Sequence, residues 1–519
     1  MRKLMSLIVL LFAALSASAN VTLNDLFSDH MVLQRDLPVA VFGQAAPGEK
    51  VTVSFAGQEK SVTAGQDGLW NVKLNPMSAC TNSQVLTVTG QNKIEVKDVV
   101  VGDVWLCSGQ SNMEWVLRNC ERQEDINQAN FPLLRHIEVQ KRVSSHPQTE
   151  IQGRWNVCTP QSAGGFTAVG FYFGRKLQQE TGIPIGLIKS AWGGTCIEPW
   201  INPEGLAPIS ELAKDREQLE QKFKDYRKAL AESLPKIDAY VVEVRKALAS
   251  NADLPRQVEI PTYPVSDRDP KGWHSLYNGM INPLVNFGIK GALWYQGESN
   301  GGEGVSYYQK MRALIGGWRK AWQVGDFPFY FVQLADFQDS NNKPEGGDGW
   351  AKLRMAQSKS LTIPRTGMAV TIDVGNPRDI HPKNKKDVGE RLALWALAKD
   401  YGKKDLVYSG PQYKGMQIEG DKIRLMFDSV GSGLTVATKN GYDPMVKESQ
   451  GKLQRFAIAG ASKKWVWADA VIDGATVVVS SSSVTNPVAA RYAFSQNPEG
   501  CNLYNNEGLP ASPFRTDEW

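Results

Sequence analysis

A serine at position 111 stands where an α/β sequence would place a catalytic group. Residues 104–113 read VWLCSGQSNM, an apolar run that changes abruptly into small and polar residues. The first half predicts a buried parallel strand, and Gly109 allows backbone angles that other residues resist. The second half predicts a tight turn that presents Ser111 at the carboxyl edge of a sheet, where α/β folds place their chemistry. A strand followed by an ordinary polar turn is the other interpretation of this segment alone.

A serine hydroxyl is a weak nucleophile and needs an adjacent base, a role that suits histidine near neutral pH. The chain has five histidines. His30 lies in a β-rich region, His136 on a predicted strand and His146 in a polar loop. His381 precedes Pro382, which holds it extended just before a predicted helix. We therefore favour His381 as the base and expect His274 to line the substrate pocket.

An acid is needed to fix the tautomer of the base. Asp379 lies two residues before His381, so a local turn could bring its carboxylate to the imidazole ring. Asp373 and Glu298 are the alternatives. A nucleophile, a base and an acid that follow separate predicted strands form an acyl-transfer site if those strands are parallel neighbours.

The tetrahedral intermediate of acyl transfer also needs donors for its oxyanion. The backbone N–H of Ser111 and that of Gly193 or Gly194 are candidates, and the side chain of Gln296 is a third. Gly193 and Gly194 could equally form an ordinary turn after a strand.

These groups require a parallel sheet to bring them together. From about residue 98 the sequence alternates between strand-like and helix-like patterns, which is typical of such a sheet. The predicted strands are Val104–Cys107, Ile185–Ser190, Gly291–Tyr295, Phe327–Leu334 and Gly367–Ile372. The predicted helices are Thr167–Glu180, Val305–Trp322, Trp350–Ser360 and Lys386–Asp400.

The chain divides into four predicted parts. Residues 1–19 read as a signal peptide, residues 20–97 as a β-sandwich domain, 98–401 as the catalytic α/β domain and 402–519 as a β-rich domain. Residues 208–250 form an insertion in the catalytic domain. Apolar residues recur there on one helical face, and Pro235 interrupts the pattern, which predicts a helical hairpin.

The N-terminus predicts export. Arg2 and Lys3 precede an apolar stretch that ends at a small-residue cleavage site, so cleavage is expected after Ala19 and the protein is expected to be periplasmic or secreted. No other stretch is long enough for a membrane span. The formal net charge of the whole chain is only +4, which argues against nucleic acid as a partner. The six cysteines show no metal-ligand spacing.

Several motifs in order along the chain resemble those of one enzyme family. The segment GQSNM at 109–113 is similar to the nucleophile block of the SGNH hydrolases. More narrowly, the sequence resembles the sialate O-acetylesterase-like family of carbohydrate esterases. That likeness runs from about residue 100 to the C-terminus, through SAWGGT (190–195), LYNGMI (276–281), WYQGESN (294–300), DIHP (379–382) and LYNNEGLP (503–510).

The resemblance implies a flavodoxin-like, three-layer SGNH domain with accessory β domains, without a metal or other cofactor. It implies removal of acetyl groups from sugar hydroxyls, with Ser111 as nucleophile and His381 as base. Gly194 and Gln296 complete the oxyanion hole beside the Ser111 N–H. The same motifs supply the expected substrate contacts: Trp192, His274, Tyr277, Asn278 and Glu298.

One position departs from the SGNH pattern, which places the acid three residues before the histidine. Arg378 occupies that position here, and the nearest acid, Asp379, is two residues before His381. The acid is therefore Asp379 at an unusual offset or a more distant carboxylate, or else a Ser–His dyad works with a backbone carbonyl.

The leading hypothesis is an exported sialate O-acetylesterase, with an O-acetylated sialic acid or glycan as its partner. An acetyl xylan or xyloglucan esterase is the alternative. A glycan-binding protein with an inactive site comes third, although it would not need all these motifs intact. A glycosidase using Glu298 and Asp379 would leave Ser111 idle, and a lipase would carry a Gly-x-Ser-x-Gly elbow, which Ser111 lacks.

Overall fold

A long strand, β8 (Lys93–Gly109), runs through the centre of the computed structural model, which describes residues 20–265 and 267–519. The predicted signal peptide lies outside the described residues. β8 belongs to a sheet with the order β10-β9-β11-β8-β12-β13-β14. Every neighbouring pair from β9 to β14 is parallel, and β10 joins antiparallel at the edge.

All five predicted strands are present in this sheet. They lie within or overlap β8, β11 (Ile185–Ala191), β12 (Gly291–Tyr295), β13 (Phe329–Val332) and β14 (Thr366–Ala369). Two further strands extend it, β9 (Phe131–Glu138) and β10 (Trp155–Cys158). Every residue of β11 and β12 is buried, because helices cover both faces of the sheet and leave no polar side.

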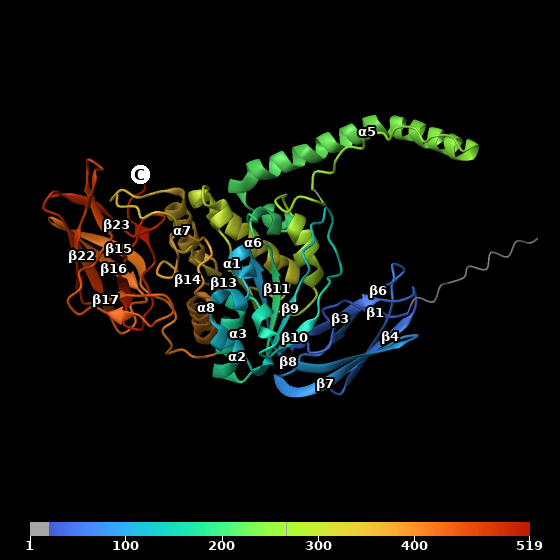
Figure 1. Cartoon of the computed structure of the whole chain (residues 1–519), viewed down its shortest axis with the longest axis horizontal. Helices are drawn as coiled ribbons and strands as arrows, with labels where there is room; N and C mark the ends of the chain where they lie inside the picture. The colour runs from blue at the N-terminus through green and yellow to red at the C-terminus, as the bar shows by residue number, and fades with distance from the viewer. Residues whose placement is uncertain (1–19, 266) are drawn as a thin grey trace, which may run out of the picture.

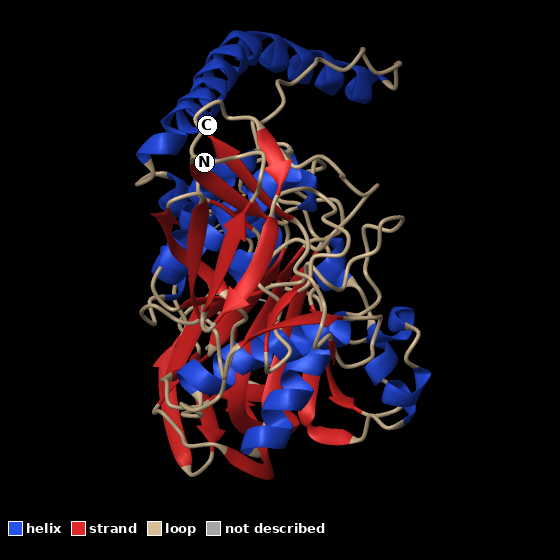
Figure 2. Cartoon of the chain, turned by 90° about the vertical axis from the view of Figure 1, so that its left-hand side faces the viewer, coloured by secondary structure: helices blue, strands red, loops and turns tan. Residues whose placement is uncertain are grey.

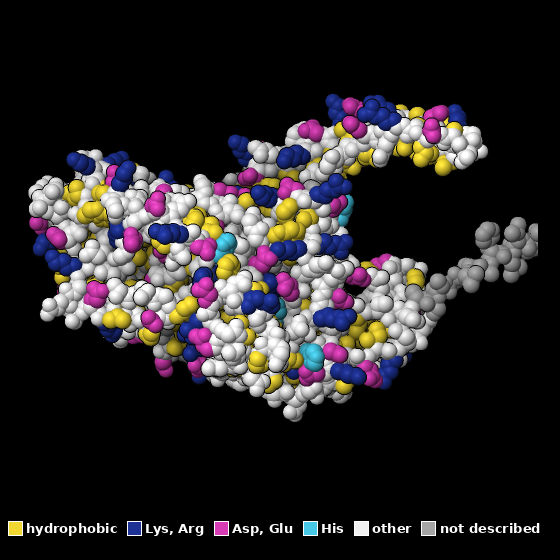
Figure 3. Space-filling view, in the orientation of Figure 1, with side chains coloured by type: hydrophobic (Ala, Val, Ile, Leu, Met, Phe, Trp, Pro, Cys, Tyr) yellow, Lys and Arg dark blue, Asp and Glu magenta, His cyan; other side chains and the backbone are white. Residues whose placement is uncertain are grey.

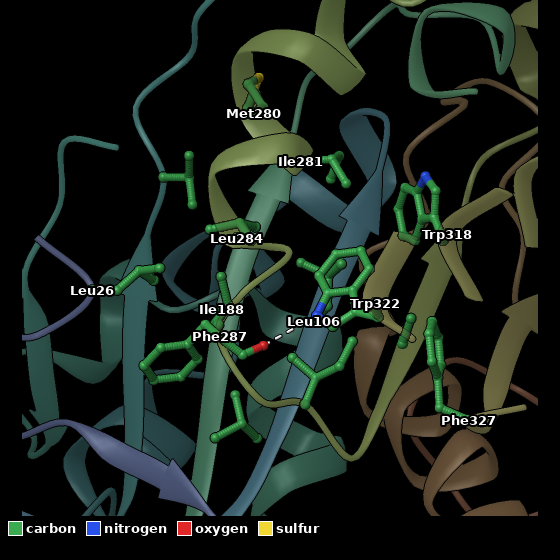
Figure 4. Packing of buried hydrophobic residues seen from close by; sticks show 14 of the residues in the cluster. Leu26, Leu106, Ile188, Met280, Ile281, Leu284, Phe287, Trp318, Trp322 and Phe327 are labelled. Atoms are coloured by element: carbon green, nitrogen blue, oxygen red, sulfur yellow. Dashed lines mark hydrogen bonds between the residues drawn. The ribbon is translucent and has the colours of Figure 1, made fainter. Parts of the chain in front are cut away.

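The two faces carry different helices (Figure 1). On one face, α3 (Ala168–Thr181) and α8 (Lys385–Asp400) pack with Trp105 and Leu187 of the sheet. On the other, α6 (Tyr307–Trp322) packs Trp318 and Trp322 over Leu106 and Ile188, as Figure 4 shows from close by. The remaining short helices are α1 (Ser111–Glu114), α2 (Gln123–Asn127), α4 (Pro203–Leu206) and α7 (Gly349–Lys359). The predicted mixed α/β fold around a central sheet is therefore confirmed.

Additional β-structure lies at both ends of the described chain (Figures 1 and 2). The N-terminal strands are β1 (Thr22–Leu23), β2 (Val32–Gln34), β3 (Val39–Gln44), β4 (Lys50–Phe55), β5 (Gln58–Thr63), β6 (Leu69–Leu74) and β7 (Cys80–Thr89). Since β2 and β7 pair with β8, the N-terminal β region shares a strand with the central sheet. The predicted boundary between residues 97 and 98 falls inside that strand.

The C-terminal strands form three small antiparallel sheets around their own apolar core. They are β15 (Gln412–Glu419), β16 (Lys422–Asp428), β17 (Leu434–Thr438), β18 (Val446–Lys447), β19 (Phe456–Gly460), β20 (Trp465–Trp467), β21 (Asp469–Asp473), β22 (Thr476–Ser480), β23 (Pro487–Tyr492), β24 (Leu503–Asn505) and β25 (Phe514–Arg515). No described helix is both long enough and apolar enough to cross a bilayer.

The predicted helical hairpin in the insertion is wrong. Residues 213–250 form one helix, α5 (Ala213–Ser250), with Pro235 inside it. Pro235 lies on the exposed side, where solvent can reach the carbonyl that its missing N–H leaves free. Before Pro235 the returning chain packs on the apolar stripe, where Tyr263 contacts Phe223 and Tyr226, and the stripe continues beyond Pro235 to Leu248, which is largely exposed. The helix therefore projects from the body with hydrophobic side chains along its lower edge (Figure 3).

Candidate functional site

The turn after β8 places Ser111 at the carboxyl edge of the sheet, as predicted. Gly109 has φ of 134°, and a Cβ there would lie 2.2 Å from the carbonyl oxygen of Tyr295, so glycine is required for the close approach of β8 and β12. The Gln110 N–H then donates to the same carbonyl at 3.0 Å. The chain turns into α1, whose first residue is Ser111.

The structure brings Ser111 and His381 together across 270 positions of sequence. His381 Nε2 lies 2.9 Å from Ser111 Oγ. The loop between β14 and α8 carries the histidine, and the indole of Trp115 stacks on its ring with centroids 5.2 Å apart and planes 15° apart. A hydroxyl and an imidazole at this distance can transfer a proton, as nucleophilic catalysis by serine requires.

Asp379 is the predicted carboxylate that contacts His381 within the described chain. Its Oδ1 accepts the backbone N–H of His381 at 2.9 Å and lies 3.3 Å from His381 Nδ1. Asp373 instead forms a two-pronged ion pair with Arg391, at 2.7 and 2.8 Å. The Asp379 side chain is 41% exposed, so solvent screens its charge more than it would screen that of a buried acid.

The second predicted turn lies directly against the nucleophile. A Cβ on Gly193 would lie 3.2 Å from that of Ser111. The Gly193 N–H donates to Glu114 Oε2 at 2.6 Å. Gly194 has φ of 75° and open space beside it, and within the described chain neither its N–H nor that of Ser111 makes a hydrogen bond. Two backbone donors are thus unengaged around the serine.

Gln296 lies behind these donors in a buried network. Its amide nitrogen lies within hydrogen-bond distance of Gln110 Oε1, Thr195 O and Asn300 Oδ1, at 3.1, 3.2 and 2.7 Å. Its amide oxygen accepts from Tyr307 at 2.6 Å. Because one amide nitrogen carries two hydrogens, a bond from Gln296 to an oxyanion requires one of these contacts to yield.

The predicted substrate contacts separate into two places. Trp192 flanks the nucleophile turn. Its backbone N–H donates to Gly109 O at 3.0 Å, and Lys141 Nζ lies 5.4 Å from the centre of its indole ring. Glu298 lies at the end of β12 and accepts a 2.5 Å hydrogen bond from Asn112.

His274, Tyr277 and Asn278 line a different cavity, of about 720 Å³, beneath the base of α5. Neither Ser111 nor His381 lines that cavity. The structure therefore places these three side chains on a cavity other than the turn that carries Ser111, and their contact with substrate stays a prediction. His274 is buried, its Nδ1 lies 2.6 Å from Ile201 O, and burial lowers its pKa.

Four side chains at the site did not emerge from the sequence: Asn112, Glu114, Trp115 and Lys385. Three of them lie within the four residues after the predicted nucleophile, and Lys385 lies four residues after His381 at the start of α8. Lys385 is fully buried and Asn112 is 1% exposed. Burial lowers the pKa of Lys385 to about 7, and burial raises the pKa of Glu298, the carboxylate beside Asn112.

In the part of the chain that the structure describes, no group of three or more His, Cys, Asp or Glu side chains is placed to hold a metal ion. The six cysteines, all within that part, are free.

Known proteins match this chain along most of its length. The model of the family "Carbohydrate esterase, sialic acid-specific acetylesterase" matches residues 101–241 and 267–398. Sialate O-acetylesterases of Rattus norvegicus and Homo sapiens are each 30% identical to it; both alignments cover 98% of this chain, with 97% of the rat and 94% of the human protein. The crystal structure of a carbohydrate acetylesterase from Xanthomonas citri superposes with a TM-score of 0.79 at 39% identity, covering 96% of this chain and all of that one. The chain therefore belongs to this family of carbohydrate esterases, as its motifs predicted.

Proposed function

We propose that the protein hydrolyses O-acetyl esters on sugar hydroxyls, with Ser111 as the nucleophile and His381 as the base. The contact of 2.9 Å between Ser111 Oγ and His381 Nε2 carries this proposal. The two unengaged backbone N–H groups beside the serine support it, because ester hydrolysis develops negative charge on the carbonyl oxygen.

In the proposed mechanism, Ser111 Oγ attacks the acetyl carbonyl carbon while His381 Nε2 takes the hydroxyl proton. The oxyanion accepts hydrogen bonds from the N–H groups of Ser111 and Gly194, with Gln296 as the third proposed donor. His381 then gives its proton to the departing sugar oxygen, leaving an acetyl ester on Ser111. Water, deprotonated by His381, hydrolyses that ester and releases acetate. Asp379 holds the imidazole from its Nδ1 side.

We assign O-acetylated sialic acid as the leading substrate, because the sialate O-acetylesterases align with almost the whole chain. An acetylated plant glycan such as xylan or xyloglucan is the second candidate. The solved relative at higher identity, described as a carbohydrate acetylesterase, supports this broader class. Trp192 and Glu298 are the proposed substrate-side residues at the nucleophile. A glycosidase is disfavoured, since it would leave the contact between Ser111 and His381 without a role.

The proposal includes two features of the whole protein. The catalytic domain has the flavodoxin-like, three-layer arrangement of an SGNH hydrolase, and the chain is exported after cleavage behind Ala19. N-terminal sequencing of the secreted or periplasmic protein tests the second feature, since an intact Met1 would contradict it.

Acetate release tests the activity. Wild type, Ser111→Ala and His381→Ala are compared on O-acetylated sialic acid and on acetylated xylan and xyloglucan oligosaccharides. We expect each variant to lose most turnover while its circular dichroism spectrum stays that of the wild type. The preferred sugar identifies the substrate class. A Ser111→Ala protein with near-normal activity would refute the serine mechanism. A wild type that binds these glycans and releases no acetate would refute the esterase.

A further inference from the structure

Two buried side chains connect the segment of the nucleophile to the segment of the base. Asn112, next to Ser111, donates from Nδ2 to the carbonyl oxygen of Ile380 at 3.0 Å. Lys385 Nζ donates to Asn112 Oδ1 at 2.5 Å and to the carbonyl oxygen of Pro382 at 2.6 Å. The residues on either side of His381 are thus both connected to the residue after Ser111.

This ring of bonds fixes a distance that catalysis needs. Ser111 and His381 lie on separate loops, after β8 and after β14, and β12 and β13 lie between those strands in the sheet. A loop anchored on one side of His381 could still swing about that anchor. Anchors at both Ile380 and Pro382 remove that freedom, so the imidazole stays within reach of the serine.

The chemistry of these bonds allows one arrangement. A backbone carbonyl only accepts, so the nitrogen of Asn112 must face Ile380 and its oxygen must face Lys385, whose Nζ carries hydrogens for both of its acceptors whether charged or neutral. Glu298 Oε1 reinforces this orientation by accepting from the same nitrogen at 2.5 Å. Asn112 and Lys385 are almost entirely buried, and in a dry site each lost partner leaves a polar group unsatisfied.

Lys385 also supports the histidine through an aromatic ring. Its Nζ lies 5.6 Å from the centre of the Trp115 ring, and that ring stacks on His381. Lys385 therefore also packs against the indole that stacks on the imidazole, in addition to bonding the loop that carries it.

We propose that Lys385 and Asn112 are positioning residues, which hold His381 against Ser111 by bonding both flanks of the histidine. This inference rests on the proposed serine mechanism. It assigns these residues no contact with substrate and no part in proton transfer.

The test measures kcat and KM for acetate release by Lys385→Met, Asn112→Ala and the double variant. We expect kcat to fall about 10- to 100-fold in each single variant, because a small misplacement of a catalytic group costs that much. KM should stay within about threefold, since the ground-state substrate contacts remain. The kcat of the double variant should be no lower than that of the more impaired single variant, because either change breaks the same set of hydrogen bonds.

Lys189→Met is the matched control. Lys189, in β11, is buried like Lys385, but it pairs with Glu138 at 2.7 Å and has no hydrogen bond or ion pair to either neighbour of His381. It should lose stability and keep its kcat. Wild type and Ser111→Ala are measured beside these variants. A wild type without activity would refute the proposed function, not the positioning role of Lys385 and Asn112.

Three results would overturn the inference. One is a folded Lys385→Met protein with kcat within threefold of wild type. The second is a loss that lies in KM. The third is a fold-loss of kcat in the double variant that equals the product of the two single losses, which would mean that the two residues act separately. If Lys385→Met does not fold, Asn112→Ala carries the test alone through its kcat and KM.

Discussion

Asp379→Asn tests whether the carboxylate at the unusual offset supports catalysis. The amide is isosteric, and its oxygen can still accept the backbone N–H of His381, which the carboxylate now accepts at 2.9 Å. The turn that carries the histidine therefore stays intact, and the substitution removes mainly the negative charge 3.3 Å from His381 Nδ1.

The size of the effect follows from that distance and from exposure. At 3.3 Å, a unit charge stabilises the imidazolium that forms in the transition state by about 1 kcal/mol in water and about 5 kcal/mol at an effective dielectric constant of 20. The Asp379 carboxylate is 41% exposed, so solvent screening places the contribution in the lower part of that range, about 1–3 kcal/mol. We therefore expect kcat to fall about 10- to 100-fold, less than the roughly 10⁴-fold loss that follows neutralisation of a buried triad acid.

The assay is acetate release at saturating substrate, with Asp379→Ala as the comparison that also breaks the turn. Glu298→Gln and Asp373→Asn test the other two carboxylates. The reasoning is refuted if Asp379→Asn keeps kcat within threefold of wild type. It is equally refuted if Asp373→Asn keeps its fold and loses more kcat than Asp379→Asn.

Three further substitutions have definite expected outcomes. Gly194→Ala meets no neighbouring atom but must hold alanine at φ of 75°, so its N–H should turn away and kcat should fall several-fold; an unchanged kcat would exclude this donor. Pro235→Ala restores an N–H within α5 and should favour the helix locally by about 3 kcal/mol, seen as slower hydrogen exchange around that position; faster exchange would contradict it. Burial lowers the pKa of Lys385 to about 7 from 10.5, so between pH 7 and 10 the folded chain has released a proton that the unfolded chain still holds. The free energy of unfolding of the wild type should therefore rise with pH in this range, and Lys385→Met should remove that rise. That rise reaches about 1.4 kcal/mol per pH unit, and urea titrations that change equally with pH in both proteins would contradict it.

The sequence was sufficient to predict the central sheet and the edge where the chemistry lies. Buried parallel strands are continuous apolar runs, so β11 and β12 could be located closely, whereas only the carboxyl-terminal part of β8 was predicted. Since parallel strands end on one edge, the polar groups after them could be assigned to one site. The contact between Ser111 and His381 follows from that rule.

Other features depend on information that a local pattern does not contain. The cavity that His274, Tyr277 and Asn278 line depends on how segments distant in sequence pack together, which periodicity does not reveal. The continuity of α5 past Pro235 is not visible in the sequence either, because a proline usually ends or kinks a helix and this one lies exposed within it. Lys385 carries no signal of burial, because a lone lysine in a helix usually lies in solvent.

The unusual position of Asp379 and the buried ring of Lys385 and Asn112 are two parts of one arrangement. A carboxylate that accepts the backbone N–H two residues on forms an Asx-type turn, and this turn requires the two-residue spacing found here. The same oxygen then reaches His381 Nδ1 only at 3.3 Å and from a partly exposed position. Such a contact holds the ring less firmly than a buried acid would. The bonds to the carbonyls of Ile380 and Pro382 act on the backbone, where exposure of Asp379 has no effect. Asp379→Asn acts on the charge and tautomer of the imidazole and Lys385→Met on its position, and because both act through His381 we expect the double variant to lose less kcat than the product of the two single losses.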